Sequence, residues 1–152
     1  MFEGQFLEVY TKFKVLMYKK IFSSAEAQNQ ALTAMEHFCA ETIYVLNRPT
    51  ILEFARFVNI SAPNAVYKIN NLMKKGYIVK VRSEQDRREY HLEVTEKYLQ
   101  TYGSTYSYVD TVMKRIRQRF SPEDAEKFGE LLRVINEELM PEATEGIENA
   151  RF

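Results

Sequence analysis

The sequence predicts a mostly α-helical fold of the α+β class, in which a single β-hairpin interrupts a series of helices. Apolar residues recur at spacings of three and four along most of the chain, which has only 5 Gly, 4 Pro and no Trp. One amphipathic segment opens at Thr50, and a second runs from Ser61 to Gly76. Two β-patterned runs follow, 77–82 and 89–94, and between them lies a charged turn of Asp86, Arg87 and Arg88. This order of helix, tight turn, helix and basic-tipped hairpin predicts a winged helix-turn-helix.

The N-terminal part of the chain is expected to form one amphipathic helix and a loop. Apolar residues share one face of the helix at helical spacing: Phe6, Val9, Tyr10, Phe13, Leu16, Met17 and Ile21. The small and polar run 23–30 predicts the loop.

Three short helices are predicted in the winged module. Thr33 and Thr50 are each followed by a Glu three residues later, a capping-box pattern that begins a helix. The helix after Thr33 ends before Pro49, because the residue before a proline is pushed out of helical geometry. Ser61 is a good N-cap, and Pro63 in the first turn costs no needed hydrogen bond. We expect the three helices to bury Met35, Phe38, Cys39, Ile43, Leu46, Ile51, Leu52, Ala55, Val58, Val66, Ile69, Leu72 and Met73.

Further helices are predicted after the hairpin. Thr95 can cap a long helix that reaches about Phe120, and Gly103 either bends or interrupts it. A final helix is predicted from Ser121 to Pro141, with a proline at its first helical position and acids in its first turn.

The terminal helices have apolar stripes that the compact winged unit cannot all bury. Burial against a second copy of the chain is the simplest solution, and it predicts a homodimer. We therefore divide the chain into four segments: an N-terminal dimerisation helix and loop at 1–31, the winged helix-turn-helix module at 32–95, C-terminal dimerisation helices at 96–141 and a frayed tail at 142–152.

The chain has no net charge, with 21 basic and 21 acidic residues, but these charges are unevenly distributed. Bases outnumber acids between residues 67 and 90, and acids dominate between residues 121 and 149. Such a polarised molecule turns its basic part toward a polyanion. The alternative is an ordinary solvated face, which is the commoner origin of a charge run. Here the basic run coincides with the second helix and the hairpin, which favours a nucleic-acid partner.

The cellular setting is also constrained by composition. A lone Cys39 excludes an internal disulfide and agrees with a reducing compartment. Neither a basic-then-apolar leader nor an apolar run of membrane-spanning length is found, so we expect a cytoplasmic protein with no membrane partner.

The second helix of the predicted helix-turn-helix carries polar residues opposite its apolar stripe. The candidate DNA contacts on this recognition helix are Ser61, Asn64, Tyr67, Lys68 and Asn71. An α-helix fits the major groove, where Asn can bond an adenine edge and Lys can contact guanine or phosphate. Lys74 and Lys75, at the far end, are expected to meet phosphate or solvent. For any single one of these residues, an ordinary exposed polar position is an equally weighted alternative.

The tip of the predicted wing supplies the second set of candidate DNA contacts, Asp86, Arg87 and Arg88. Asp86 lies two residues before Arg88, so a tight turn lets the carboxylate orient the guanidinium. An oriented arginine suits the enhanced negative potential of a narrow minor groove. The alternative is a surface ion pair worth about 0–1 kcal/mol that only shapes the turn. The preceding helices favour the DNA interpretation.

Two stretches carry a family resemblance, NISAPNAVYKINNLMKKGYIVKVRSEQDRREYHLEVTEKY and FSPEDAEKFGELL. With the Leu72-x-x-x-Gly76 helix end, the Asp-Arg-Arg wing and the Val94-Thr95 entry to the next helix, the chain resembles the MarR family of bacterial transcription regulators over about residues 32–140. The resemblance implies an obligate dimer that binds a palindrome, usually as a repressor released by a small ligand or by oxidation. In that pattern Arg88 enters the minor groove and Asp86 braces it. One departure is Tyr98, where the family commonly has Gly, and it concerns the packing under the wing.

Rival functions have less support in the residues. Some relatives of this kind sense peroxide through a cysteine, but Cys39 lies on an apolar face, where a buried thiol has a raised pKa and is inert. His37 and His91 lack metal-like spacing, so no metal and no cofactor are predicted. No nucleophile elbow or phosphate-binding Gly-rich loop occurs, so no catalytic residue is predicted and an enzyme is not expected.

We therefore predict a homodimeric, sequence-specific DNA-binding transcriptional regulator, and specifically a repressor released by a small-molecule effector. Its partners would be a palindromic double-stranded DNA operator and a second copy of the chain. One alternative is a winged helix used only for protein–protein contact, which would show no salt-dependent DNA affinity. A regulator that responds to oxidation of Cys39 is the other.

Overall fold

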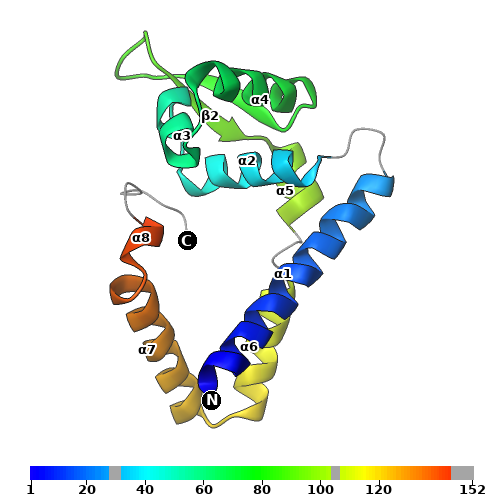
Figure 1. Ribbon diagram of the computed structural model, residues 1–152, viewed down its shortest axis with the longest axis vertical. Helices are drawn as coiled ribbons and strands as arrows, with labels where there is room; N and C mark the ends of the chain where they lie inside the picture. The colour runs from blue at the N-terminus through cyan, green and yellow to red at the C-terminus, as the bar shows by residue number, and fades with distance from the viewer. Residues whose placement is uncertain (28–31, 104–106, 145–152) are drawn as a thin grey trace. The chain divides into compact units, whose positions relative to one another are not determined.

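The computed structural model describes residues 1–27, 32–103 and 107–144, which fall into two compact units on either side of residues 104–106 (Figure 1). The first unit holds α1 (Phe2–Ala27), α2 (Ala34–Val45), α3 (Ile51–Val58), α4 (Ala62–Lys74), β1 (Ile78–Arg82), β2 (Tyr90–Val94) and α5 (Glu96–Tyr102). The second unit holds α6 (Ser107–Arg119), α7 (Pro122–Glu138) and α8 (Pro141–Thr144). Helices dominate and the two strands form one antiparallel hairpin, so the predicted mostly helical winged helix-turn-helix is confirmed.

Side-chain caps begin the helices of the winged module where the sequence predicts them. The Glu36 amide donates to the Thr33 hydroxyl at 3.2 Å, and the Thr33 amide donates to the Glu36 carboxylate at 2.8 Å. The same reciprocal pair joins Thr50 and Glu53. The Ser61 hydroxyl accepts from an amide of the first turn of α4 at 3.3 Å. Each cap satisfies amides that a helix leaves free at its start, so these starting points are local properties of the sequence.

The hairpin is tied to the helices at both ends. Gly76 ends α4 with a φ of 80°, a left-handed conformation that favours glycine. The Thr95 hydroxyl donates to the Gly76 carbonyl at 2.7 Å, which joins the two ends of the hairpin. The Leu92 amide donates to the Pro49 carbonyl at 2.8 Å and so fastens β2 to the α2–α3 connection. The strands pair from Ile78 opposite Val94 to Arg82 opposite Tyr90.

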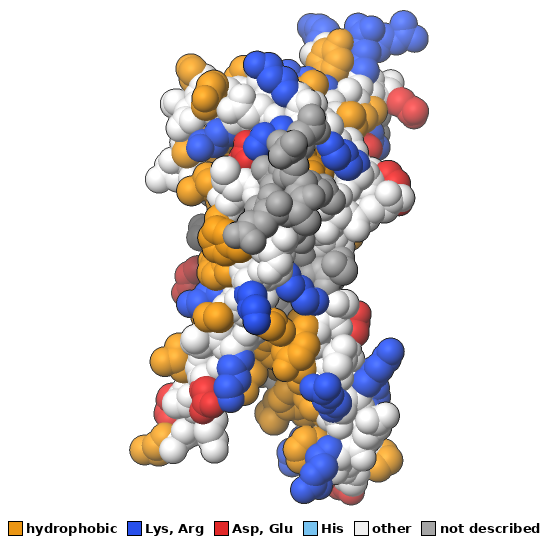
Figure 2. Space-filling model, turned by 90° about the vertical axis from the view of Figure 1, so that its right-hand side faces the viewer, with side chains coloured by type: hydrophobic (Ala, Val, Ile, Leu, Met, Phe, Trp, Pro, Cys, Tyr) orange, Lys and Arg blue, Asp and Glu red, His pale blue; other side chains and the backbone are white. Residues whose placement is uncertain are grey.

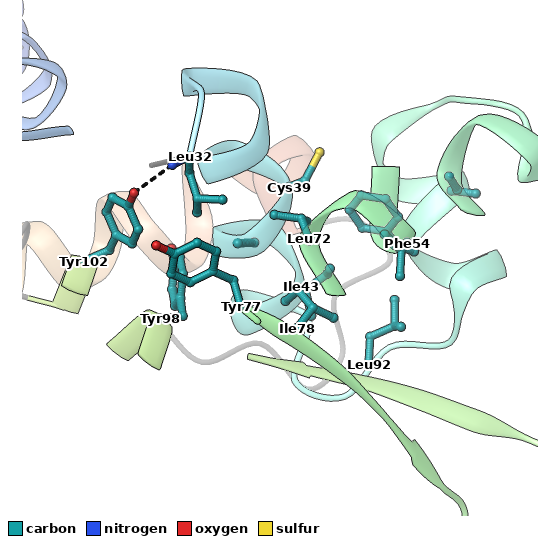
Figure 3. Packing of buried hydrophobic residues seen from close by; sticks show 14 residues of the cluster. Leu32, Cys39, Ile43, Phe54, Leu72, Tyr77, Ile78, Leu92, Tyr98 and Tyr102 are labelled. Atoms are coloured by element: carbon teal, nitrogen blue, oxygen red, sulfur yellow. Dashed lines mark hydrogen bonds between the residues drawn. The ribbon is translucent and has the colours of Figure 1, made fainter. Parts of the chain in front are cut away.

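The core of the first unit lies where α2, α3, α4 and the hairpin meet (Figure 3). Its largest fully buried side chains are Leu32, Ile43, Phe54, Ile69, Leu72, Tyr77, Ile78, Leu92 and Tyr102. The small side chains of Ala40 and Ala65 are also fully buried, which fits the packing of α2 against α4. Burial of this apolar surface is the main favourable contribution to folding.

The inward faces of the helices differ in part from the prediction. Four residues predicted to be buried are exposed instead: Met35, Phe38, Leu52 and Val66. Five residues of these helices outside the prediction are buried: His37, Ala40, Thr42, Phe54 and Ala65. The physical reason is helix rotation, because neighbouring residues point 100° apart and the packing partners decide which edge of an apolar stripe turns inward.

Several predicted boundaries also differ. Helix α1 continues to Ala27, past Ser23 where a loop is predicted, because helix-favouring residues such as Ala and Glu extend it. The rest of that predicted loop, 28–30, lies outside the described residues. The predicted long helix is two helices, because α5 ends at Tyr102 with Gly103 as its C-cap and α6 is a separate helix.

The end of the described chain is helical for longer than expected. Helix α7 ends at Glu138, and a further turn, Pro141–Thr144, forms α8 where a frayed tail is expected. Proline is well suited to the first position of that turn. Residues 145–152 of the expected tail lie outside the described residues.

Helix α5 belongs to the first unit, although the division of the sequence assigns residues 96–102 to the C-terminal segment. Tyr98 and Tyr102 of α5 are buried beside Tyr77 and beside His37 of α2. The His37 ring centroid lies 5.7 Å from that of Tyr98 and 5.0 Å from that of Tyr102. Position 98 is therefore a core position in this chain, and Tyr98 is only 5% exposed.

The phenols of this cluster link distant parts of the chain. The Leu32 amide donates to the Tyr102 hydroxyl oxygen at 3.0 Å, which joins the start of α2 to the end of α5 (Figure 3). Burial, together with the nearby hydrogen-bonded Tyr102 phenol, raises the pKa of Tyr77 to about 12. Burial also raises the pKa of Tyr98 far above its usual value. These two phenols therefore stay neutral at neutral pH.

We expect Tyr102→Phe to destabilise the protein by about 1–3 kcal/mol, because it leaves the buried Leu32 amide without an acceptor. Urea unfolding followed by circular dichroism measures this loss. Tyr18→Phe is the matched control, because Tyr18 is exposed on α1 and the same hydroxyl deletion there should be neutral. Equal stability of Tyr102→Phe and the wild type would contradict a structural role for this bond.

His37 differs from the other buried polar side chains among the described residues, because neither of its ring nitrogens has a hydrogen-bond partner. Its Nε2 lies 3.9 Å from Oε2 of Glu41. Burial lowers the pKa of His37 and raises the pKa of the half-buried Glu41, because burial disfavours the charged form of each group. A neutral His37 suits the aromatic cluster, but it makes stability dependent on pH.

We expect acidification to destabilise the protein through His37. Below pH ~6.5 the unfolded chain binds a proton at this residue while the folded protein does not. The free energy of unfolding therefore decreases as the pH is lowered, until the pH reaches the lowered pKa of His37 in the folded protein. Glu41 acts in the opposite direction at lower pH, and comparison with His37→Phe isolates the histidine. In the wild type, His37 should add a slope of up to ~1.4 kcal/mol per pH unit to the free energy of unfolding between pH 5 and 7, measured by urea titration. The variant should lack this contribution. Parallel stability profiles would show that His37 does not titrate as proposed.

Candidate nucleic-acid interface

Helix α4 turns one narrow face into the core and the rest toward solvent. The buried face consists of Ala65, Ile69 and Leu72. The opposite face follows helical spacing and carries the exposed residues Pro63, Tyr67, Asn70 and Lys74. The cap at Ser61 leaves the free amides of the first turn near the start of this exposed face.

The predicted contacts on α4 are not equally accessible. Ser61, Asn64 and Tyr67 are exposed, and Tyr67 keeps 67% of its surface free. Lys68 and Asn71 are half-buried at the edges of the exposed face. Lys68 directly precedes the buried Ile69, so helical spacing places it at an edge of the exposed face rather than at its centre.

Sequence reasoning missed Asn70, which is exposed on the same face as Tyr67. A signal was available, because Asn70 lies three residues after Tyr67 and helical spacing brings such pairs together. Val66 is likewise exposed, although it is predicted to be part of the buried stripe.

The far end of α4 is held by two lysines that have protein partners. Nζ of Lys75 donates to the Glu36 carboxylate at 2.7 Å, which ties the end of α4 to the start of α2. Nζ of Lys97 donates to the Lys75 carbonyl at 2.6 Å and lies 4.6 Å from the centre of the Tyr77 ring. The expectation that Lys75 meets phosphate or solvent is therefore corrected, because its ammonium group is engaged by Glu36.

The wing tip is organised by Asp86. Its carboxylate accepts from the Arg88 amide at 2.9 Å, and the Arg88 guanidinium donates to both carboxylate oxygens at 3.3 and 3.4 Å. The backbone bond and the side-chain bond from Arg88 both lower the pKa of Asp86. The Arg88 side chain is 91% exposed, so Asp86 holds an arginine that projects into solvent. Arg87 is also exposed.

Other local hydrogen bonds shape the loop behind this tip. The Ser83 hydroxyl accepts from the amides of Gln85 and Asp86 at 3.3 and 3.2 Å. The Glu89 amide donates to the Asp86 carbonyl at 2.9 Å, and Nε of Arg82 donates to the Arg87 carbonyl at 2.6 Å. The loop therefore has its own hydrogen-bond scaffold, which reduces the conformational entropy that a contact with a ligand would remove.

Basic side chains gather at this part of the first unit. Figure 2 shows Lys and Arg side chains protruding at the end of the unit where Figure 1 draws α4 and the hairpin loop. The exposed bases of these elements are Lys74, Lys80, Arg82, Arg87 and Arg88. A concentration of positive charge on one edge attracts a polyanion even though the whole chain is neutral.

Cys39 is buried in the core, and burial raises the pKa of its thiol more than the charge of Lys68 lowers it. This agrees with the structural role predicted from the sequence. Within the described ranges, no group of three metal-ligating side chains could hold a metal ion. No helix in the same ranges is both long enough and apolar enough to span a bilayer.

The comparison with protein families matches residues 32–90 to the MarR family. Residues 32–90 form a MarR-family domain. This domain comprises α2, α3, α4, β1 and the wing up to the start of β2. The predicted resemblance is thereby supported over the segment that carries the exposed α4 face and the wing tip. No curated protein sequence matches the chain.

Solved structures share the fold of the chain around this MarR domain. A mutant MepR from a multidrug-resistant clinical isolate of S. aureus has a TM-score of 0.65 and 16% identity, covering 92% of this chain and 98% of its own. Tm0710 from Thermotoga maritima has a TM-score of 0.63 and 18% identity, covering 89% and 91%. FabT from Streptococcus pneumoniae, in complex with DNA, has a TM-score of 0.61 and 20% identity, covering 91% and 97%. At these identities the likeness concerns the fold.

We expect Ser83→Ala to loosen the wing of the MarR domain, because two amides lose their shared acceptor. Loss of about 1 kcal/mol of local stability corresponds to roughly fivefold faster exchange of the Gln85 and Asp86 amides. Hydrogen exchange followed by NMR measures this change. Ser23→Ala, which removes a hydroxyl that donates to a carbonyl within α1, should leave wing exchange unchanged. Unaltered exchange in Ser83→Ala would mean that the serine does not hold the loop.

Proposed function

We propose that this protein is a sequence-specific DNA-binding transcriptional regulator. The observation that carries the proposal is that one MarR-family domain contains both the exposed face of α4 and an exposed Arg88 that Asp86 holds at the wing tip. Helix α4 would enter the major groove, with Ser61 and the first-turn amides near a phosphate. Arg88 would enter the adjacent minor groove, where negative potential is enhanced, and Asp86 would limit its orientations.

Two of the structural relatives support the choice of partner. The FabT structure contains DNA, and so does another MepR structure with a TM-score of 0.59 and 16% identity. We extend that partner to this chain because its own basic edge suits a duplex. Arg87 and the half-buried Asn71 and Lys68 would then contribute from the margins of the interface, with Asn64 and Tyr67 nearer its centre.

A homodimer is proposed from the apolar surface of the terminal helices. Helices α6 and α7 have no buried residue, and together with the turn between them they expose Val109, Phe120, Phe128, Leu131 and Leu132. Helix α1 exposes Phe2, Phe6, Leu7, Val9 and Tyr10. Apolar surface of this extent is normally covered by a partner. A twofold dimer would present two α4 helices to successive major grooves of a palindrome, roughly 34 Å apart.

The same proposal includes the direction of control. We infer that the dimer acts as a repressor and that a small ligand releases it from DNA, as the resemblance to the MarR family implies. Release by oxidation of Cys39 has less support, because the thiol is 3% exposed and burial raises its pKa.

We expect Arg88→Ala to weaken binding to an operator selected from a random duplex library by ~1–3 kcal/mol. Fluorescence anisotropy at two salt concentrations measures the affinity, and wild-type affinity should fall steeply with salt because phosphate contacts release counterions. Arg133→Ala is the matched control and should keep the wild-type affinity. It also removes an acid-paired arginine, one that pairs with Glu137 at 2.9 Å, but this arginine lies on α7 and not on the wing.

Sedimentation velocity checks that both variants keep the oligomeric state of the wild type. Unchanged affinity of Arg88→Ala at matched salt would refute the wing assignment. A wild-type protein that selects no duplex, and binds none in a salt-dependent way, would favour a winged helix used for protein–protein contact.

A further inference from the structure

The exposed face of α4 has a restricted chemistry. The helix contains no arginine and no acidic residue, and its polar side chains other than Tyr67 are asparagines and lysines. Asn64 and Asn70 are exposed, Asn71 is half-buried, and Val66 is 37% exposed among them. Val66 lies beside the buried face, which Ala65, Ile69 and Leu72 form, and keeps part of its apolar surface in solvent.

The lysines are poorly placed to read bases in the middle of this face. Lys68 is half-buried and directly precedes the buried Ile69, so it lies at an edge of the exposed face. Lys74 lies in the last turn, and Lys75 is held by Glu36. A helix of a helix-turn-helix reads base edges mainly with its N-terminal residues, so a lysine in the last turn meets the backbone instead.

Each base pair has a chemical counterpart among side chains. Arginine and lysine bond guanine, acids accept from cytosine, asparagine bonds adenine at N6 and N7, and an apolar side chain contacts the thymine methyl group. Apart from the lysines at its edge and its end, the exposed surface of α4 offers Tyr67, asparagines and Val66, and so counterparts of adenine and thymine but none of cytosine. Val66 and Asn70 are one turn apart, so their side chains are neighbours and can address the same or adjacent base pairs.

We propose that Val66 and Asn70 are specificity-determining residues that make α4 select A·T base pairs in each half-site. Asn70 donates from its side-chain amide to adenine N7 and accepts from the adenine N6 amino group. Val66 packs against the thymine C5 methyl group. This inference rests on the proposed DNA-binding function and adds to it the base composition that α4 reads.

The first experiment is selection of duplexes from a random library by the full-length wild-type protein, followed by binding titrations. Selected half-sites should contain A·T pairs where α4 docks, and replacing one of these by G·C should weaken binding roughly tenfold or more. For Asn70→Ala the same replacement should have little effect. Asn136→Ala, an exposed asparagine on α7, should keep the wild-type preference.

Single-atom changes in the DNA test the two contacts separately. Replacing the contacted thymine by deoxyuridine removes one methyl group and should cost the wild type about fourfold in affinity. The same DNA should cost Val66→Ala nothing further, whereas Val79→Ala, at an exposed valine of β1, should remain sensitive. Replacing adenine by 7-deazaadenine should weaken the wild type and leave Asn70→Ala unaffected.

The outcomes distinguish this inference from the function on which it rests. Selected half-sites with G·C pairs under α4 would overturn the inference and leave DNA binding intact. So would Val66 and Asn70 variants that keep the wild-type sensitivity to deoxyuridine and 7-deazaadenine. Failure of the wild-type protein to select or bind any duplex would overturn the proposed function itself, and the inference with it. Thermal melting checks that both alanine variants are folded, which is expected because both sites are exposed and alanine favours helix.

Discussion

Complete burial of one narrow face of α4 is the constraint on which the rest of this structure depends. Ala65, Ile69 and Leu72 have no exposed surface, and a close-packed core does not let the helix rotate about its axis. A rotation by one residue, about 100°, would move Ile69 or Leu72 into water and turn exposed polar side chains inward. The packing that stabilises the module therefore also decides which side chains of α4 can meet a partner.

The position of α4 along its axis is held at both ends. Ser61 caps its start, and the Glu36–Lys75 pair with the Lys97 bond fastens its end to α2 and α5. Glu36 also caps α2, so one carboxylate serves two helices. Exposed ion pairs contribute little to stability, but these partners are partly buried and share hydrogen bonds with the backbone. Their role is to fix the geometry between helices.

The wing is held differently, because it has almost no core of its own. Its shape comes from hydrogen bonds between near neighbours, centred on the Ser83 hydroxyl and the Asp86 carboxylate. Such a loop can be exposed and still ordered enough to present Arg88 in few orientations. The domain therefore has a rigid helix with a surface suited to base edges and a locally braced arginine suited to electrostatic attraction, in a chain whose total charge is zero.

The sequence by itself determined what depends on residues close together in the chain. The caps at Thr33, Thr50 and Ser61 and the Asp86–Arg88 brace follow from spacings of two or three residues, because each bond closes a short ring that needs no distant partner. Only the tertiary structure decided the rest: the outward positions of Val66 and Asn70, the burial of Tyr98, and the capture of Lys75 by Glu36, 39 residues away. Those features depend on which helix packs against which and at what rotation, and a periodic apolar stripe leaves that rotation open by one residue on either edge.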